Sequence, residues 1–575
     1  MATTATPQPR NCRFLPQGYK LTQWPELEAY YQQLLERPIH TVAELQQWID
    51  DRSELDAVIS EDFSWRYIKI TVDSSDKSAN EAYQYAAQEL SPKVTSMEHQ
   101  LNVKLVQNPF LSQLDPAHYG IYIRNARNAV ELHCEDNIPL VTEVQLKAKE
   151  YGRLFSEMTI GVNGVQMTLQ KAGALLEETD RNYRESIYHK INQRILQDTE
   201  NLEELFDEML RQRHLTAQNS GFDNFRDYKF QSLGRFDYSA DDCLRFHDSI
   251  ASEILPLLDE LNEHRRKLLD IKVLRPWDLN VDTSGQQPLR PFESVEELVD
   301  KTVTCLSRLH HSFGDAIRLM WQKGHLDLES RKGKRPGGYN MPLHLSGLPY
   351  IFMNAANSVS DMRTLLHESG HAIHSLLTHA HQLSSAKRVP FEVAELAAMS
   401  MELLTMDHWD VFFPEPEELR RARIGQLENV LKVLPWIATI DKFQHWIYTN
   451  PQHTRAERKA AWMDILKTFT SSQVDFTGLD HYQEYLWHKQ LHIFEVPFYS
   501  IEYGMAQLGA IALWKKYREN PEETISNYIK ALELGYSKSI PEIYETAGIS
   551  FDFSPAYVRE LGAFVKTELE KLIAD

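Results

Sequence analysis

Residues 364–374 read Thr-Leu-Leu-His-Glu-Ser-Gly-His-Ala-Ile-His and contain the pattern His-Glu-x-x-His, from His367 to His371. In a helix, residues four positions apart lie on the same face. The two imidazoles can therefore bind one ion at the roughly 2.0–2.1 Å that zinc prefers. Glu368 lies about 100° around the helix from His367. From there its carboxylate does not bind the ion but can contact a water molecule next to it. The stretch predicts a helix that presents a zinc site with a general base.

Chance alone gives on the order of 0.1 such patterns in a chain of this composition. The flanking residues Leu365, Leu366 and Ile373 are apolar and predict a buried helix. Burying two histidines and a glutamate is costly unless one partner satisfies them together, as a metal ion does. We therefore favour a metal site over coincidence.

Zinc needs a third protein ligand and an open position. Leu377 stands where a metzincin-type site would have a third histidine, so that class is excluded. The mostly apolar segment 391–402 is predicted to form a helix with three candidate ligands, Glu392, Glu395 and Glu402. An apolar helix with acids on one stripe suits one ligand and one supporting acceptor. Spacing alone does not choose among the three.

The chain has 575 residues, of which 42% are apolar and 25% charged, and a net charge of −21. These are globular proportions, and the acidic balance argues against nucleic acid and anionic membranes as main partners. No apolar run approaches the roughly 18–20 residues that a membrane-spanning helix needs. The polar stretch Met1–Arg10 lacks the features of a signal peptide.

The chain contains four cysteines, spaced far apart, with no C-x-x-C pair. Neither a cysteine zinc site nor a redox pair is expected from this spacing, and four cysteines make no disulfide framework. We expect a cytoplasmic protein, in which the metal ligands are imidazole and carboxylate groups.

Most of the chain has the periodicity of helices. One hairpin is predicted around Asn163-Gly164, and we expect a boundary near residue 185. It would separate an N-terminal helical lobe with the hairpin, 1–185, from a catalytic lobe, 186–575. The apolar run 348–353 is predicted to be a strand, either in the core or paired with a bound peptide. The basic run 331–335 is either a solvated loop or a cationic rim.

The pattern His367-Glu368-x-Gly370-His371-x-x-His374, followed by Ala394-Glu395, resembles the thimet/oligoendopeptidase F family of zinc metallopeptidases. The chain length is closest to the oligoendopeptidase F branch. The resemblance extends over about residues 330–510 and includes Gly337-Gly338-Tyr339, Pro349–Asn354 and the segment from His492 to Tyr503.

The resemblance implies roles for seven residues. His367, His371 and Glu395 would be the ligands of one Zn²⁺, and Glu368 would be the catalytic glutamate. The groups that hydrogen-bond the reacting carbonyl would be His492, Tyr499 and Tyr503. It leaves open which tyrosine does so, because the spacing from His492 is one residue longer than in the thimet branch. His374 is a candidate supporting group.

The resemblance also implies a mainly α fold: an ellipsoidal multi-helix body with a deep substrate channel and a small β element near the zinc helix. It implies a zinc endopeptidase that cleaves short peptides. Two alternatives stay open: a zinc carboxypeptidase, for which the basic run 331–335 is the local hint, and a catalytically silent peptide-binding protein. The oligomeric state, monomer or dimer, is not predicted.

Overall fold

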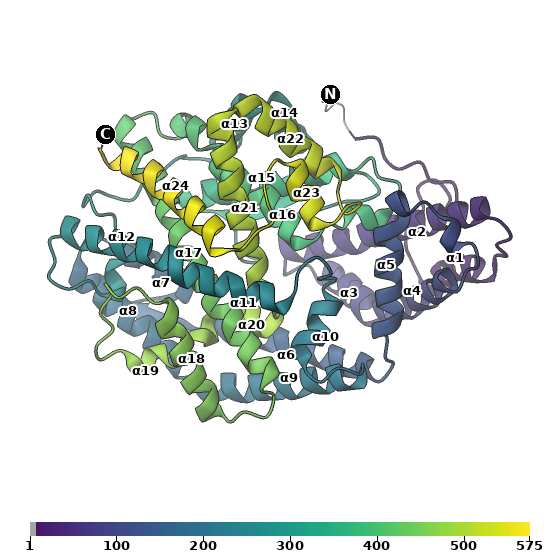
Figure 1. Ribbon diagram of the computed structural model, residues 1–575, viewed down its shortest axis with the longest axis horizontal. Helices are drawn as coiled ribbons and strands as arrows, with labels where there is room; N and C mark the ends of the chain where they lie inside the picture. Colours follow the sequence, from purple (N-terminus) through teal and green to yellow (C-terminus); the bar gives the residue numbers. More distant parts are fainter. Residues whose placement is uncertain (1–6, 575) are drawn as a thin grey trace. The chain divides into compact units, whose positions relative to one another are not determined.

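The computed structural model describes residues 7–574, and helices dominate it (Figure 1), which confirms the mainly α prediction. Residues 1–6, part of the segment assessed for a signal peptide, lie outside this range. The chain forms two compact units, each built from three separate stretches. The predicted boundary near residue 185 stays a prediction, as do the ellipsoidal shape and the channel.

The first unit comprises the chain up to His133, then Arg290–Ala422 and Gly509–Phe551. Its helices are α1 Trp24–Glu36, α2 Val42–Val72, α3 Lys77–Tyr85, η1 Ala86–Leu90, α4 Ser91–Val106, η2 Leu111–Gln113, α5 Pro116–Leu132, α13 Val295–Leu309, α14 His311–Gln322, α15 Val359–Thr378, η6 Ser384–Lys387, α16 Phe391–Leu404, η7 Met406–Val411, α22 Pro521–Glu533 and α23 Ile540–Thr546. In its N-terminal stretch, α1, α2 and α4 pack around a core that includes Leu27, Trp48 and Leu101.

The second unit comprises Cys134–Leu289, Arg423–Leu508 and the chain from Asp552 onward. Its helices are α6 Asn137–Glu157, α7 Leu169–Ala174, η3 Leu175–Glu177, α8 Arg181–Leu196, α9 Thr199–Asn219, α10 Phe225–Ser232, α11 Ala240–Ser249, η4 Ile250–Ile254, α12 Leu255–Leu268, η5 Pro276–Asp278, α18 Arg455–Phe469, α19 Asp480–Gln483, η8 Leu486–Lys489, α20 Leu491–Glu495 and α24 Pro555–Ala574. The C-terminal helix α24 packs against α11 and η4 (Figure 1). Two further helices, α17 Pro416–Thr449 and α21 Ser500–Glu519, contain the positions where the chain passes between units.

The described residues include two small sheets. In the second unit, β1 Thr159–Val162 and β2 Val165–Thr168 form the predicted antiparallel hairpin. Its turn places Asn163 and Gly164 at φ 52° and 80°, the left-handed conformation that an Asn-Gly hairpin turn requires. The first unit has a three-stranded sheet in the order β3-β5-β4.

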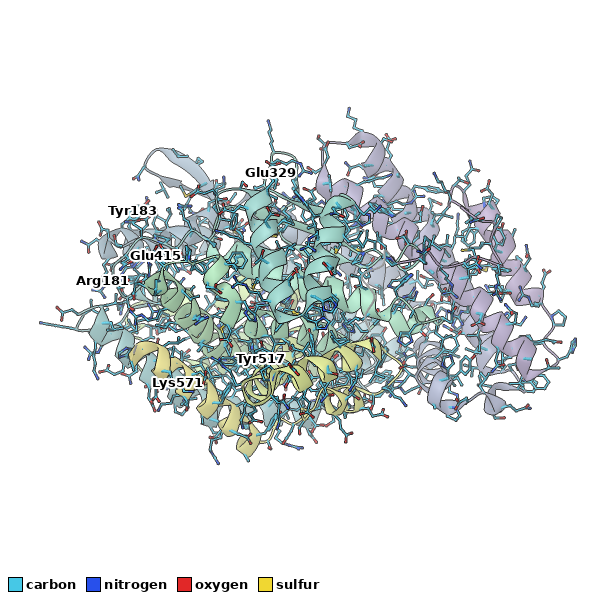
Figure 2. The ribbon with its side chains drawn as sticks, turned by 90° about the horizontal axis from the view of Figure 1, so that it is seen from above. Arg181, Tyr183, Glu329, Glu415, Tyr517 and Lys571 are labelled. Carbon is cyan, nitrogen blue, oxygen red and sulfur yellow. The ribbon has the colours of Figure 1, made fainter. Side chains whose placement is uncertain are left out.

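The three-stranded sheet lies beside α15, so the predicted small β element is confirmed. Its strands are β3 Leu326–Glu329, β4 Tyr339–Met341 and β5 Tyr350–Ala355. Figure 2 labels Glu329, the last residue of β3. The central strand β5 runs parallel to β3 and antiparallel to β4. It is buried along most of its length and leads directly into α15, whose position it fixes. Within residues 7–574, none of the helices combines the length and apolar character needed to cross a bilayer.

Candidate metal centre and active site

Helix α15 begins at a well-defined N-terminal cap. Ser358 accepts a hydrogen bond from the backbone N–H of Asp361, and the Asp361 carboxylate accepts one from the N–H of Ser358. This reciprocal pair satisfies two of the backbone donors that a helix start leaves open. Asn357, at φ 64°, makes the turn from β5 into the helix, a conformation that Asn tolerates better than most residues. The start of α15 fixes the register of the residues that follow.

Gly370 lets α15 and α16 approach closely. A Cβ atom at this position would lie 2.6 Å from both the carbonyl oxygen of Ala397 and the Cα of Ala398. No side chain fits there without moving the backbone of α16. Tyr528 holds α16 in place, since its hydroxyl donates to the Ala397 carbonyl at 2.7 Å. The glycine in the His-Glu-x-Gly-His sequence thus brings the α16 acids to the α15 histidines.

The donor atoms of His367, His371 and Glu395 lie within 4.8 Å of one another. Glu395 Oε2 is 3.4 Å from His367 Nε2 and 3.8 Å from His371 Nε2. Ligand atoms at 2.0–2.1 Å from a tetrahedral zinc ion are about 3.4 Å apart. The residues therefore fit a zinc ion with two imidazole ligands and one carboxylate.

The outer ring nitrogens of both histidines have fixed partners. His367 Nδ1 lies 2.8 Å from Glu402 Oε1, and the His371 imidazole hydrogen-bonds the backbone of Ala394. Such partners orient a metal-binding imidazole and select its tautomer. We shall refer to His367, His371, Glu395 and Glu402 as the α15–α16 cluster.

The charges of this cluster favour a cation. Burial alone would lower the pKa of His367, but hydrogen bonds to Glu395 and Glu402 outweigh burial and raise it well above its ordinary value. Burial lowers the pKa of His371 to about 4, so this imidazole is neutral at pH 7, as a metal ligand must be. Positive charge is stabilised at His367 because two carboxylates face it.

Glu368 is buried next to these donors, with an exposed fraction of 7%. Burial raises the pKa of Glu368 to about 7; His367 opposes the rise, and Glu395 adds to it. The backbone N–H of Asn340 in β4 donates a hydrogen bond to the Glu368 carboxylate. The Oε2 atom of Glu368 has no hydrogen-bond partner among the described residues. A carboxylate with a pKa near 7 and a free oxygen is suited to accept and return a proton.

Two other residues considered in the sequence lie elsewhere. Glu392 is buried on α16 but does not belong to the group of converging donors. His374 is buried, and its imidazole hydrogen-bonds the backbone of Leu532 in α22. Burial lowers the pKa of His374 to about 3. Among the three acids left open by spacing, the geometry favours Glu395 as the shared donor and Glu402 as the partner of His367.

The structure settles two further alternatives. Because β5 is the central strand of its sheet, it cannot add a peptide strand, and the core interpretation of 348–353 is correct. The basic run 331–335 was predicted to be a solvated loop or a cationic rim. Both interpretations are wrong for Lys334, because its side chain is fully buried. Its ammonium donates to Asp327 Oδ1 and to the carbonyl of Met353. Arg331 pairs with the same Asp327 carboxylate.

In the second unit, the rings of His492, Tyr499 and Tyr503 gather into one group. The ring centroids are 5.7 Å apart for His492 and Tyr499, 5.9 Å for His492 and Tyr503, and 5.0 Å for the two tyrosines. Gln490 hydrogen-bonds His492 Nδ1 and accepts from Trp436 Nε1 at 3.1 Å. The structure thus brings these three predicted residues together, and their catalytic roles stay predictions.

Comparison with known proteins identifies the family. Residues 174–563, more than half of the chain, match Peptidase family M3, and residues 14–133 match the Peptidase M3 N-terminal domain. The chain belongs to peptidase family M3.

Relatives of this M3 peptidase carry related names. An oligoendopeptidase F homolog of Borreliella burgdorferi is 21% identical over 73% of this chain and 72% of its own length. The chromosomal oligoendopeptidase F of Lactococcus lactis subsp. cremoris is 22% identical over 71% of this chain and 67% of its own length. A solved structure of PZ peptidase A with an inhibitor superposes with a TM-score of 0.89 at 26% identity, covering 97% of this chain and 99% of that one.

The segment that precedes Tyr499 in this M3 peptidase has a strained backbone that sequence reasoning did not find. Phe498 is buried at φ 68°, a genuine outlier for a bulky residue. Its N–H donates to Gln444 at 2.7 Å, and its carbonyl accepts from buried Arg235 at 2.5 Å. Arg235 also pairs with Glu502 on the following helix. Strain held by such contacts is common where a side chain must be aimed.

Proposed function

We propose that this M3 peptidase is a zinc-dependent endopeptidase that hydrolyses internal bonds of short oligopeptides. The observation that carries the proposal is the convergence of His367, His371 and Glu395, with buried Glu368 beside them. The oligoendopeptidase F names of its relatives support the substrate class.

His367, His371 and Glu395 would hold one zinc ion, with Glu402 orienting His367 through its Nδ1. Zinc supplies Lewis acidity, which polarises a peptide carbonyl and lowers the pKa of water. The two imidazoles and one carboxylate leave a net positive charge at the ion, which preserves that acidity. Co²⁺ or Mn²⁺ could occupy the same ligands.

Glu368 is the proposed general base. Its Oε2 takes a proton from the attacking water and returns it to the nitrogen of the leaving amine. The N–H of Asn340 holds the carboxylate in place. A pKa raised by burial makes both transfers favourable near neutral pH, and a bound divalent cation would lower it somewhat.

We propose His492, Tyr499 and Tyr503 as donors to the carbonyl oxygen of the scissile bond, as the resemblance implies. Their mutual ring contacts support a shared role. The Gln490 hydrogen bond at Nδ1 orients the His492 ring. A neutral donor of this kind typically contributes about 10²–10³ to the rate.

The edge strand β4 is the proposed site of backbone pairing with the substrate. Among the strands of residues 7–574 it pairs with β5 alone, and its Asn340 contacts Glu368. A peptide added to a strand edge is bound through its main chain, with little dependence on side chains. This replaces β5 as the candidate for that role.

The alternatives have less support. A carboxypeptidase needs a cation for the substrate C-terminus, and Arg331 and Lys334 are both engaged by Asp327. A silent peptide-binding protein has no need of a buried general base such as Glu368. We further propose a cytoplasmic enzyme without nucleic-acid partners, in keeping with the absence of a C-x-x-C pair and the net charge of −21.

An internally quenched peptide blocked at both ends tests the proposal. We expect the zinc-loaded enzyme to cleave it, a chelator to abolish cleavage and added zinc to restore it. Cleavage of only the free-ended version would establish the carboxypeptidase instead. Binding of both peptides without turnover would establish the silent binder.

A further inference from the structure

A second cluster of metal-binding residue types lies inside the second unit. Helix α11 carries Cys243 and His247, and α17 carries Asp441 and His445, each pair four residues apart. Their exposed fractions are 0%, 0%, 0% and 4%. Four-residue spacing places each pair on one face of its helix, so two helices present their polar pairs to a common buried point. We call these residues the α11–α17 cluster.

Three of the four side chains converge as metal ligands do. One donor atom each from Cys243, Asp441 and His445 lies within 4.8 Å of the others. His445 Nε2 is 3.2 Å from Asp441 Oδ2. That separation is close to the roughly 3.4 Å expected between two ligands of one tetrahedral zinc ion.

Asp441 and His445 each have a buried polar atom that the described part of the chain leaves without a hydrogen bond. Among the described residues, His445 Nδ1 and Asp441 Oδ1 have no hydrogen-bond partner. The other carboxylate oxygen, Asp441 Oδ2, faces His445 Nε2 at 3.2 Å. A buried carboxylate oxygen without a partner is destabilising, and a cation bound at this point would satisfy it.

His247 provides the outer support that metal ligands usually have. Its Nε2 lies 2.9 Å from Asp441 Oδ2, and a donor at this distance fixes the orientation of the carboxylate. Outer hydrogen bonds to ligating carboxylates and histidines are a regular feature of protein metal sites.

We propose that the α11–α17 cluster binds a second divalent ion of the zinc class. Cys243 Sγ, the Asp441 carboxylate and His445 Nε2 are the ligands, and His247 holds the carboxylate. On binding, the Cys243 thiol loses its proton to solvent, and the thiolate and carboxylate together neutralise the ion. Sulfur and imidazole ligands favour zinc or cobalt over magnesium or calcium.

The ion has a structural role. The site is sealed, so metal is taken up as the unit folds, and its binding free energy contributes to folding. The His445 ring packs on Phe498 at 5.3 Å between centroids. Phe498 is the strained residue immediately before Tyr499, so the ion braces the segment that aims this tyrosine. The sequence predicted one zinc ion and no cysteine ligand, because no C-x-x-C pair occurs. In the α11–α17 cluster, the donors that converge with Cys243 come from a distant helix, on Asp441 and His445.

Cobalt substitution of the full chain tests the proposal. A thiolate bound to Co²⁺ gives a charge-transfer band in the near ultraviolet, whereas the α15–α16 cluster offers only nitrogen and oxygen. We expect the wild-type chain, washed with a weak chelator, to retain about two cobalt ions and to show the band. Cys243→Ser should lose the band and retain about one ion.

Two further variants complete the experiment. Cys305→Ser removes another buried thiol, on α13, which donates to the Thr405 carbonyl, and should leave band and stoichiometry unchanged. A His367→Ala, His371→Ala double variant should keep the band and about one ion. A wild-type chain with about one ion and no band would overturn the proposal, as would a band that persists in Cys243→Ser. If Cys243→Ser fails to fold, the wild-type spectrum and the double variant still decide.

Discussion

The α15–α16 and α11–α17 clusters use the same arrangement for different ends. In each, residues four apart on one helix face an acid on a neighbouring helix. The histidine side chains of the first are partly exposed, 20% for His367 and 18% for His371. Those of the second are sealed, at 0% for His247 and 5% for His445. Access decides what a bound ion can do, because only the first can meet a substrate.

The comparison also shows how close helix packing is achieved. At the first cluster a glycine, Gly370, removes the side chain that would separate α15 from α16.

The first cluster also has Glu368 beside it, with one oxygen unpartnered among the residues described. A metal with a reachable base and an open side is typical of catalysis, and a closed one of structural support.

The largest effect is expected for Glu395→Gln. Loss of the proposed third ligand should reduce zinc affinity by more than the roughly 10–100-fold that loss of an outer partner costs, and peptidase activity should fall with it. Zinc titration followed by activity assay measures both. The control is Glu392→Gln, a buried acid on the same helix outside the converging group. Wild-type affinity in Glu395→Gln would move the third ligand to Glu392 or Glu402.

The tyrosines come next. Tyr499→Phe and Tyr503→Phe each remove one hydroxyl from the ring group of the second unit. The variant that lacks the working donor should lose about 10²–10³ in kcat, with zinc content unchanged, and the other should lose far less. Steady-state kinetics on one blocked peptide identifies the residue. Wild-type kcat in both variants would exclude tyrosine donors.

Glu402→Gln should have a smaller effect than the ligand variant. It leaves all three converging donors in place but weakens the contact to His367 Nδ1. We expect a loss of about 10–100-fold in zinc affinity, measured by competition with a chelator of known affinity. Saturating zinc should restore most of the activity. A loss as large as that of Glu395→Gln would mean that Glu402 is itself a ligand.

Gly370→Ala tests the helix contact. The added Cβ would lie 2.6 Å from α16 backbone atoms, so we expect a loss of about 1–3 kcal/mol in stability together with weaker zinc binding. The control is Gly120→Ala in α5 of the same unit, where nothing lies within 4 Å. Replacing a helical glycine there should stabilise by up to about 1 kcal/mol. Equal thermal midpoints for both variants would contradict the account of the motif glycine.

Local sequence patterns predicted much of the first cluster and little of its surroundings. The His367–His371 pair depends only on helix geometry, and the Asn163-Gly164 turn only on local conformation, so both follow from the sequence. The choice of Glu395 depends on how α16 packs at Gly370, which is a tertiary contact. The central place of β5 depends on strand order, which short sequence patterns do not encode.

The α11–α17 cluster was missed for the same reason. Its two pairs, Cys243 with His247 and Asp441 with His445, are visible as four-residue spacings. Each alone is too common to be informative, and only folding brings α11 and α17 together. The buried role of Lys334 was likewise hidden, because its carbonyl partners come from β3 and β5.

Glu368→Gln tests the central claim most directly. The substitution keeps the size of the side chain and leaves His367, His371 and Glu395 intact. We predict wild-type zinc content together with a loss of about 10²–10⁴ in kcat for an end-blocked peptide. Cleavage of that peptide at the wild-type rate by the zinc-loaded variant would contradict the assignment of Glu368 as the base.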